Sequence, residues 1–248
     1  MKVLVTGGAS GLGAALVVAC RQRGDGVSVI DLALGPEADF TWFQHDMGSP
    51  DPQDWARLGA WLARLGPFDL VVQSAGISAT GPFESIAPDR HLGVTGVNLA
   101  GPMQLALILQ QGGLIAQGGR LVFVASLSCF TGYPGAVSYA ASKDGLSAFA
   151  RSLRKPLRKQ GIFVQLICPG PMDTPHATRY APEGSSGKGR IAPESVACAI
   201  LRAAPRQFSV VPGAGPKLTA LLGRAFPRTM TRIMGRVLFD KLRSGPRP

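Results

Sequence analysis

Apolar residues along the chain form short runs that alternate with longer stretches of helical periodicity. Seven runs predict strands, at residues 2–5, 27–31, 41–46, 68–76, 119–126, 161–170 and 207–213. Periodic stretches between them predict helices, at residues 14–24, 54–66, 89–112, 137–160 and 193–204. Strands that alternate with helices in this way are typical of an α/β protein.

The order of these elements predicts the fold class. A single-domain Rossmann fold has a doubly wound parallel sheet with helices on both faces, and it binds its ligands at the carboxyl ends of the strands. The near-continuous apolar run at residues 161–170 indicates a strand that is buried on both faces. The length of 248 residues suits one large domain.

The net charge of +11 raises the question of a polyanionic partner. Residues 1–120 hold 7 basic and 10 acidic residues, whereas residues after 215 hold 8 basic residues and one acid. The positive charge therefore belongs to the C-terminal end and does not describe the whole molecule.

Cysteine and histidine usage bears on redox environment and metals. The cysteines follow no C-x-x-C spacing, at Cys20, Cys129, Cys168 and Cys198. We expect reduced thiols, a cytoplasmic protein and no metal site, since the three histidines are equally scattered. No signal peptide is recognisable, and no uninterrupted apolar run approaches the length of a membrane span.

A glycine-rich segment, TGGASGLG, follows the first strand at once. Glycines permit a tight turn and let the backbone approach a pyrophosphate, which then lies at a helix N-terminus. Such a segment can also be a simple turn. The residues expected to contact a dinucleotide here are Gly7, Ser10, Gly11, Leu12 and Gly13.

Asp31 ends the second strand, 18 residues after Gly13. A carboxylate at this point accepts hydrogen bonds from both ribose hydroxyls of an adenosine and repels a 2′-phosphate. Neither Ser10 nor residues 32–33 supply a basic side chain for that phosphate. We therefore predict NAD(H) in preference to NADP(H), with a solvated strand-end aspartate as the alternative.

The next two strands end in residues suited to the same ligand. Asp46 can accept from the adenine amino group, with Met47 beside it, although Asp46 can equally cap the following helix. The fourth strand ends in small residues that allow a ribose to lie against the backbone or make a simple turn, Ser74, Ala75 and Gly76.

Candidate chemical groups lie further along the chain. Tyr139 and Lys143 are four residues apart on a predicted helix and so share a face, where the ammonium would lower the pKa of the phenol. Ser126 ends the fifth strand and Asn98 lies inside a predicted helix, where asparagine is a poor helix former. The sixth strand ends in a rigid turn with Pro169, Gly170, Met172 and Thr174.

Together these segments resemble one family. TGGASGLG, Asp31, SAG, Asn98, Ser126, YAASK and PGPMDT, in this order, are similar to the compact form of the short-chain dehydrogenase/reductase family. The resemblance covers about residues 1–200. It implies that Thr174, with Met172, contacts the nicotinamide side of the cofactor.

The resemblance also implies catalytic roles. Tyr139 would donate a proton in reduction and act as the base in oxidation, and Lys143 would lower its pKa and hold the nicotinamide ribose. Ser126 would polarise the carbonyl, and Asn98 would support a water that leads protons to Lys143. We therefore expect an NAD(H)-dependent oxidoreductase that interconverts a secondary alcohol and a ketone by direct hydride transfer, as a homodimer or homotetramer.

Other interpretations stay open. One alternative is a catalytically silent nicotinamide-binding sensor or a membrane-associated scaffold. Ser74 stands where the family commonly has asparagine, and Ser128 could replace Ser126 as hydroxyl donor, although the 13-residue spacing to Tyr139 favours Ser126. His176 lies in the expected substrate loop, where it is interpreted as solvated, with a contact to the substrate as the alternative. Aromatic residues expected to line the substrate pocket are Phe130, Tyr133 and Tyr180.

We expect residues 1–215 to form the cofactor-binding and catalytic domain, and residues 216–248 a basic amphipathic extension packed on or beside it. The predicted apolar stripe contains Met230, Ile233, Met234, Val237 and Leu238, and the basic row Arg228, Arg232 and Arg236. The stripe can form a lid over the substrate pocket, a subunit contact or a peripheral membrane contact. Nucleic acid is unlikely as a partner, since no recognised nucleic-acid motif accompanies the arginines.

Overall fold

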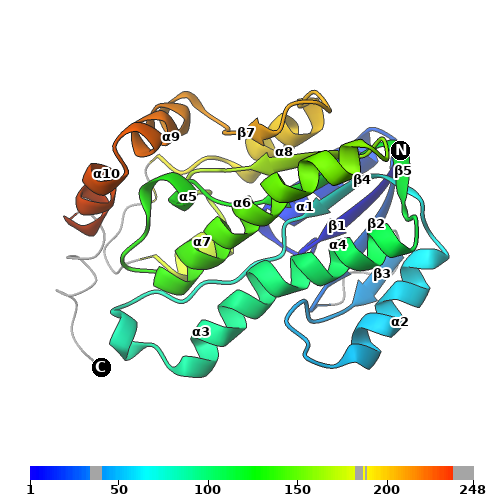
Figure 1. Ribbon diagram of the computed structural model, residues 1–248, viewed down its shortest axis with the longest axis horizontal. Coiled ribbons are helices and arrows are strands. Elements are labelled where there is room, and N and C mark those ends of the chain that lie inside the picture. The colour runs from blue at the N-terminus through cyan, green and yellow to red at the C-terminus, as the bar shows by residue number, and fades with distance from the viewer. Residues whose placement is uncertain (34–40, 182–186, 188, 237–248) are drawn as a thin grey trace.

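A parallel β-sheet forms the centre of the protein, seen in a computed structural model that describes residues 1–33, 41–181, 187 and 189–236. The strand order is β3-β2-β1-β4-β5-β6-β7, and every pair is parallel (Figure 1). The strands are β1 Lys2–Thr6, β2 Gly26–Asp31, β3 Thr41–Gln44, β4 Phe68–Gln73, β5 Ile115–Val124, β6 Phe163–Ile167 and β7 Ser209–Val210. The predicted Rossmann-type α/β fold is confirmed.

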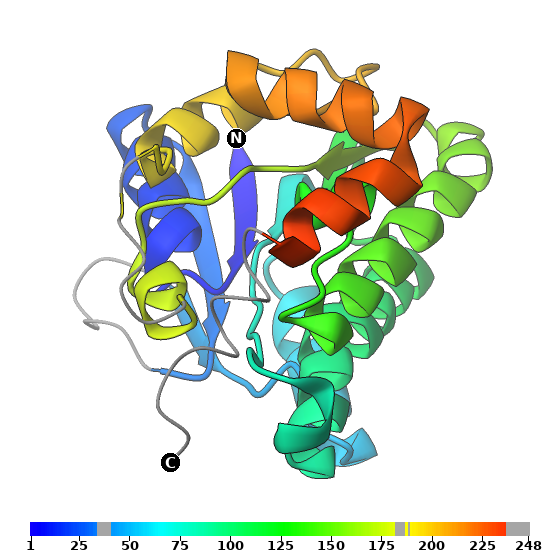
Figure 2. The ribbon, with the colours of Figure 1, turned by 90° about the vertical axis from the view of Figure 1, so that its left-hand side faces the viewer.

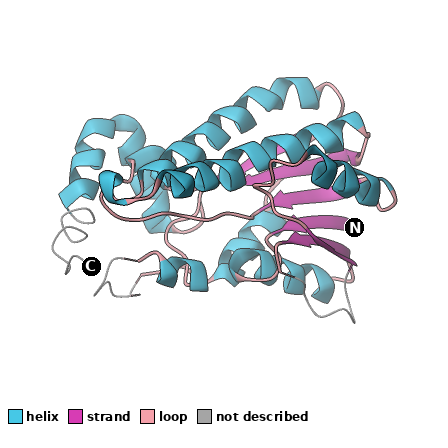
Figure 3. Cartoon of the chain, turned by 90° about the horizontal axis from the view of Figure 1, so that it is seen from below, coloured by secondary structure: helices cyan, strands magenta, loops and turns pink. Residues whose placement is uncertain are grey.

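Helices cover both faces of this sheet (Figure 3). One face packs against α2 Pro52–Ala63, α4 Gly101–Gln111 and α6 Val137–Arg158. The other face packs against α1 Gly11–Gln22 and α8 Pro193–Arg202. Further helices are η1 Phe83–Ser85, α3 Pro88–Thr95, α5 Ser128–Thr131, α7 Pro175–Arg179, α9 Ala214–Ala225 and α10 Pro227–Met234. Figure 1 places α5, α7, α9 and α10 beyond the carboxyl ends of the strands.

The apolar runs of the sequence become strands because both sides of the sheet are covered. Val3 and Val5 of β1 point to the layer of α1, whereas Leu4 points to the layer of α2, α4 and α6, and all three side chains are fully buried. Consecutive apolar residues can therefore all contribute to a core, which a sheet with one wet face would not allow.

The helix predicted at residues 89–112 is one continuous helical run of three parts. A π-helical turn, η2 Gly96–Ala100, joins α3 to α4. The length of Pro88–Gln111, and a mean hydropathy of 1.5 over 18 of its residues, would by themselves suit a membrane span. However, Leu105 and Leu109 are fully buried against the sheet, so packing in the core accounts for part of the apolar composition of this helix.

The strand order places a crevice at the centre of the sheet. β1 pairs with β2 on one side and with β4 on the other. The direction in which successive strands are added to the sheet therefore reverses between β1 and β4. In open parallel sheets, ligands bind at the carboxyl ends of the strands beside such a switch point.

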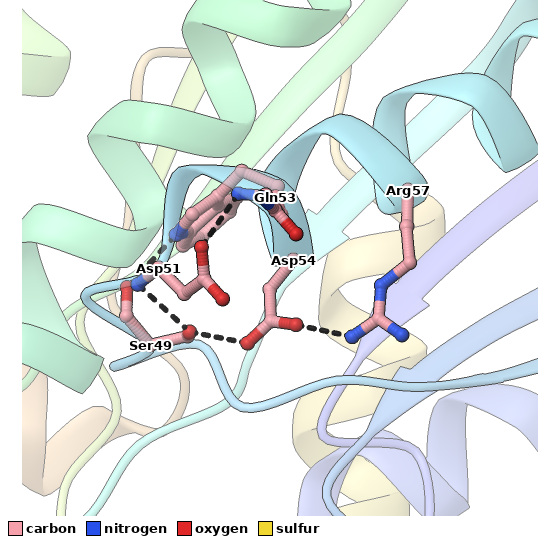
Figure 4. A network of polar contacts seen from close by, with 6 residues as sticks. Ser49, Asp51, Gln53, Asp54 and Arg57 are labelled. Carbon is pink, nitrogen blue, oxygen red and sulfur yellow. Dashed lines mark hydrogen bonds and ion pairs between the residues drawn. The ribbon is translucent and has the colours of Figure 1, made fainter.

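A polar network fixes the turn between β3 and α2 (Figure 4). The Asp51 carboxylate caps α2 by accepting from the backbone N–H of Gln53 at 2.8 Å. The Ser49 hydroxyl donates to Asp54 at 2.6 Å, and Arg57 forms an ion pair with the same carboxylate. This network holds the start of α2 and, with it, the turn at the edge of the crevice.

A buried cation joins the last helix of the core to the sheet. Arg120, in β5, donates to the Gln165 side chain at 3.2 Å and to the carbonyl oxygens of Ile200 and Ala203 at 3.0 and 3.1 Å. The two carbonyls belong to the C-terminal end of α8, where a positive charge is favourable. Burial lowers the pKa of Arg120, so the arrangement holds a charge away from water.

Replacing Arg120 with Met should lower the free energy of unfolding by about 2 kcal/mol, because two buried carbonyls lose their donor. Urea denaturation at pH 7 measures this change. The matched control is Arg151→Met, which removes an exposed arginine from α6. An Arg120→Met variant as stable as the wild type would show that the network contributes nothing.

Candidate active site

The predicted site residues come together in one cavity of about 590 Å³ at the carboxyl ends of the strands. This volume is ordinary for a small-molecule or cofactor site. Of the residues predicted from the sequence, those that line it are Gly7, Ser10, Gly11, Leu12, Gly13, Asp31, Asp46, Met47, Ser74, Ala75, Gly76, Ser126, Tyr139, Lys143, Pro169, Gly170, Met172 and Thr174. Of the predicted cofactor-binding and catalytic residues, Asn98 alone does not line it.

The glycine-rich turn is built for close backbone approach. Gly7 and Gly11 have φ values of 75° and 52°. A Cβ atom on Gly13 would lie 2.0 Å from the carbonyl oxygen of Gly7, and one on Gly7 would lie 2.8 Å from Cα of Ala75. Ser10 precedes α1 without a side-chain cap, so backbone N–H groups at this helix start are available to an anion. These features fit a pyrophosphate.

Asp31 is held beside this turn. One carboxylate oxygen accepts from the backbone N–H of Ala9 at 2.9 Å, and the other accepts from that of Ala33 at 3.0 Å. The uncharged residues Ser10 and Leu32 line the cavity next to it. The carboxylate is therefore oriented by two backbone donors, and its role in cofactor selection stays a prediction.

Asp46 and Met47 form another wall of the cavity. Asp46 accepts from the backbone N–H of Gly48 at 2.8 Å, while α2 is capped by Asp51. The interpretation of Asp46 as a helix cap is therefore wrong. Met47 is fixed by α4, since a Cβ atom on Gly101 would lie 2.1 Å from its carbonyl oxygen.

Ser74 and Thr6 tie the ends of β4 and β1 together. The Ser74 hydroxyl donates to the carbonyl oxygen of Thr6, and the backbone N–H of Ala75 donates to the Thr6 hydroxyl at 3.1 Å. The serine that stands at the family's usual asparagine position thus ties the end of β4 to the end of β1 beside the central crevice. Thr6 was not singled out in the sequence, because its partners lie 68 and 69 residues away.

Asn98 lies behind the cavity wall in the π-helical turn and is fully buried. Its amide oxygen accepts from the backbone N–H of Ile77 at 2.9 Å, and its amide nitrogen donates to the Ile77 carbonyl at 2.9 Å and to Ser142 at 3.1 Å. A Cβ atom on Gly76 would lie 3.2 Å from the Asn98 oxygen and 3.5 Å from Nζ of Lys143. Asn98 therefore braces the segment that faces Lys143, and its implied role toward a water stays a prediction.

Ser126, Tyr139 and Lys143 form the chemical end of the cavity. Burial raises the pKa of Tyr139 to about 12, and its hydrogen bond with Ser126 opposes that rise. Burial lowers the pKa of Lys143 to about 8. Nζ of Lys143 lies 5.7 Å from the centre of the Tyr139 ring and donates to the carbonyl of Val124 at 2.9 Å.

This arrangement can perform general acid–base chemistry. At pH 7 the phenol is protonated and can donate. The prediction that Lys143 lowers the pKa of this phenol is wrong for the structure, because burial dominates and raises it. Ser128 also lines the cavity, and its backbone N–H donates to Oγ of Ser126 at 3.2 Å. The contact of Ser126 with Tyr139 supports the choice of Ser126 over Ser128 as the hydroxyl beside the phenol.

The substrate end differs from two expectations. His176 lines the cavity, and the centre of its ring lies 4.8 Å from that of Tyr180, with the two rings tilted by 54°. Burial, followed by the charge of Lys143, lowers the pKa of His176 to about 4. The interpretation of His176 as solvated is therefore wrong. Tyr133 and Tyr180 line the cavity as predicted, but Phe130 does not, because it packs beneath the guanidinium of Arg224 in α9.

The C-terminal helices cover one side of this cavity, and Figure 2 shows α10 beyond the strand ends. Thr219 of α9 and Met234 of α10 line it. A Cβ atom on Gly132 would lie 3.2 Å from Oγ1 of Thr231. In the predicted stripe Met230 and Met234 are half-buried and Ile233 is exposed. The arginines of the predicted row are exposed, and Val237 and Leu238 lie outside the described residues.

All four cysteines are free, two of them buried and two half-buried. Among the residues that the structure describes, no group of three or more His, Cys, Asp or Glu side chains is placed to hold a metal ion.

The fold and the site define a dinucleotide-binding α/β protein with a Ser-Tyr-Lys constellation, and comparison with known proteins identifies the family. The model of the family "short chain dehydrogenase" matches residues 1–184. Acetoacetyl-CoA reductase of Rhizobium meliloti is 32% identical over 188 residues, which cover 73% of this chain and 77% of that protein. The chain therefore belongs to the short-chain dehydrogenase/reductase family of oxidoreductases, which act on CH–OH groups.

Solved structures share the fold. A short chain dehydrogenase from Burkholderia cenocepacia in complex with NADP has a TM-score of 0.74 and 23% identity, and covers 96% of each chain. A 4-hydroxyisoleucine dehydrogenase complexed with NADH has a TM-score of 0.70 and 22% identity, and covers 86% of this chain and 97% of the other. These structures carry both types of nicotinamide cofactor in one architecture.

The burial of Lys143 has a consequence for stability. Between pH 8 and its ordinary pKa of 10.5 the unfolded chain holds a proton that the folded chain has released. Stability from this group therefore rises with pH across that window. Lys143→Met should raise the free energy of unfolding at pH 7 by about 2 kcal/mol, net of the lost bond to Val124.

Denaturation of both proteins from pH 7 to 11 measures the effect, and the gain should shrink as the pH passes 8. Lys155→Met, on the exposed face of the same helix, is the control and should change stability little. A Lys143→Met variant that is less stable than the wild type at pH 7 would contradict the desolvation argument.

Proposed function

We propose that the protein is an NAD(H)-dependent oxidoreductase that interconverts a secondary alcohol and a ketone, with Tyr139 as the general acid or base. One observation carries the proposal. Ser126, Tyr139 and Lys143 share a single cavity with the glycine-rich turn and Asp31. A cofactor held at one end can thus reach a substrate at the other.

The residues present fit a dinucleotide. The turn at Gly7 to Gly13 and the start of α1 would hold the pyrophosphate, and Asp31 would accept from the ribose hydroxyls. Met172 and Thr174 would lie at the nicotinamide end, and Asp46 and Met47 at the adenine end. When bound, the nicotinamide supplies the hydride for reduction or accepts it in oxidation.

The chain's own groups would handle the proton. In reduction, the Tyr139 phenol donates its proton to the carbonyl oxygen, while Ser126 donates a hydrogen bond to the same oxygen and polarises the carbonyl. Lys143 stabilises the resulting phenolate by its charge. In oxidation the phenolate accepts the alcohol proton, and the same residues act in reverse.

Asp31 supports the preference for NAD(H). Its carboxylate is fixed by Ala9 and Ala33, and a 2′-phosphate at that point would meet a like charge. Residues 34–40 follow directly, and their sequence contains Glu37 and Asp39 but neither lysine nor arginine. The segment after β2 therefore offers no cation to hold that phosphate.

The cavity also bears on the substrate. Tyr133, His176 and Tyr180 form an aromatic end of the cavity, and the low pKa of His176 keeps this imidazole neutral at pH 7. Arg190 also lines the cavity and brings a positive charge to it. Such a surface suits a ketone or alcohol whose apolar part contacts the aromatic rings. The relative from Rhizobium meliloti is named as a reductase of acetoacetyl-CoA, a 3-oxoacyl thioester, which supports a ketone as one of the two reacting partners.

Replacing Tyr139 with Phe should lower turnover by about 1,000-fold, because the proton donor is lost while the ring remains. Turnover is followed through NADH absorbance with a panel of secondary alcohols and their ketones. NADH binding, measured by fluorescence, should be retained. Tyr133→Phe is the control and should keep most of the activity. A wild-type protein that binds NADH but turns over no member of the panel would favour the silent sensor.

Asp31→Ala should change the cofactor preference. Removing the carboxylate takes away both the ribose acceptor and the repulsion of a 2′-phosphate, so kcat/KM with NADPH relative to NADH should rise by about 10-fold or more. Steady-state rates with each cofactor at one fixed substrate concentration measure the ratio. An unchanged ratio would show that Asp31 does not select the cofactor.

A further inference from the structure

Helix α9 presents its side chains in the reverse of the usual order. The residues that face the protein are small: Ala220 is buried, and a Cβ atom on Gly223 would lie 2.2 Å from the carbonyl oxygen of Phe130. The bulky residues face outward instead. Leu218 is 59% exposed and Leu221 62% exposed.

The outward apolar surface continues beyond this helix. We call it the outer apolar face, and its exposed members are Leu218, Leu221, Leu222, Phe226 and Ile233. Helices on a protein surface normally turn their large apolar residues to the core and their polar residues to water. Scattered exposed leucines are common, but here Leu218, Leu221 and Leu222 share one face of α9 at i, i+3 and i+4 spacing, and α10 packs beside that helix. Such a set marks an interaction surface.

Every ionisable side chain of α9 and α10 is basic. The sequence contains no aspartate or glutamate between Glu194 and Asp240. The basic side chains of the two helices, and that of Arg236 directly after them, are exposed, at Lys217, Arg224, Arg228, Arg232 and Arg236. The two helices that carry the outer apolar face therefore carry only positive charge.

We propose that the outer apolar face docks on a membrane surface that contains anionic phospholipids. Bulky apolar residues enter the boundary between head groups and acyl chains, while surrounding lysines and arginines pair with the phosphates. A second copy of this chain fits less well, because a symmetric contact would bring two sets of cations together. A nucleic acid would leave the leucines without a partner.

The position of the two helices gives the docking a consequence for the site. The inward side of α9 and α10 supplies Thr219 and Met234 to the catalytic cavity. The same two helices thus separate the cavity from the surface on which the protein would rest. An apolar alcohol or ketone dissolved in the bilayer would be concentrated beside this side of the cavity.

Vesicle flotation with the full chain tests the proposal. Vesicles of phosphatidylcholine are compared with vesicles of phosphatidylcholine and phosphatidylglycerol, at low and at high salt. The protein should float with the anionic vesicles at low salt and stay unbound with the neutral ones. The double variant Leu221→Ser with Phe226→Ser should bind the anionic vesicles at least about 10-fold more weakly.

Matched variants separate docking from general effects. Leu92→Ser removes a 73% exposed leucine from α3, outside the outer apolar face, and should leave binding unchanged. Arg228→Glu with Arg232→Glu should abolish flotation, whereas Arg64→Glu with Arg151→Glu makes the same change in net charge at exposed positions elsewhere and should largely preserve it. NADH binding by each variant checks that it is folded, and this readout is independent of turnover.

Several results would overturn the proposal. One is wild-type protein that does not float with anionic vesicles, and another is equal binding by the Leu221/Phe226 variant. A third is wild-type protein that self-associates, together with a Leu221/Phe226 variant that no longer self-associates but still floats with the vesicles. A second copy of the chain, and not a membrane, would then cover the leucines. If the leucine variant does not fold, the charge-reversal pair decides.

Discussion

The close contact between the glycine-rich turn and the ends of the two central strands is the constraint on which the site depends. Gly13 leaves no room for a Cβ atom against the carbonyl of Gly7, and Gly7 leaves none against Ala75. Because of these contacts, α1 begins directly above the switch point of the sheet. The anion-binding helix start, the carboxylate of Asp31 and the end of β4 therefore border one cavity.

The chemical end of this cavity is maintained at the expense of stability. The fold buries the Lys143 side chain, and this burial disfavours its charged form. Its Nζ atom donates a hydrogen bond to the carbonyl of Val124. Asn98 holds the neighbouring segment through both atoms of the Ile77 peptide group. A π-helical turn places this asparagine in the interior of a long helix, where a regular helix would give it a different direction. An irregular helical turn and buried polar groups thus coincide with the site.

The C-terminal helices combine two surfaces that face in opposite directions. Their inner side is made of small residues and of Thr219 and Met234, which reach the cavity. Their outer side carries leucines and arginines. Part of the positive charge of the chain, which suggested a polyanionic partner for the whole molecule, is carried by the exposed basic side chains of these helices.

The sequence by itself determined the sheet, the layers and most of the cavity. Strand and helix periods are local properties, and Gly7, Asp31, Ser126, Tyr139 and Lys143 follow strands or share a helix face at spacings that fix where they lie. The tertiary structure alone decided what depends on distant partners. It turned Phe130 to α9, brought His176 into the cavity and placed Thr6 against Ser74, and it faced the leucines of α9 outward. The reason is physical: periodicity predicts which residues share a face, whereas the neighbour that this face meets depends on segments far along the chain.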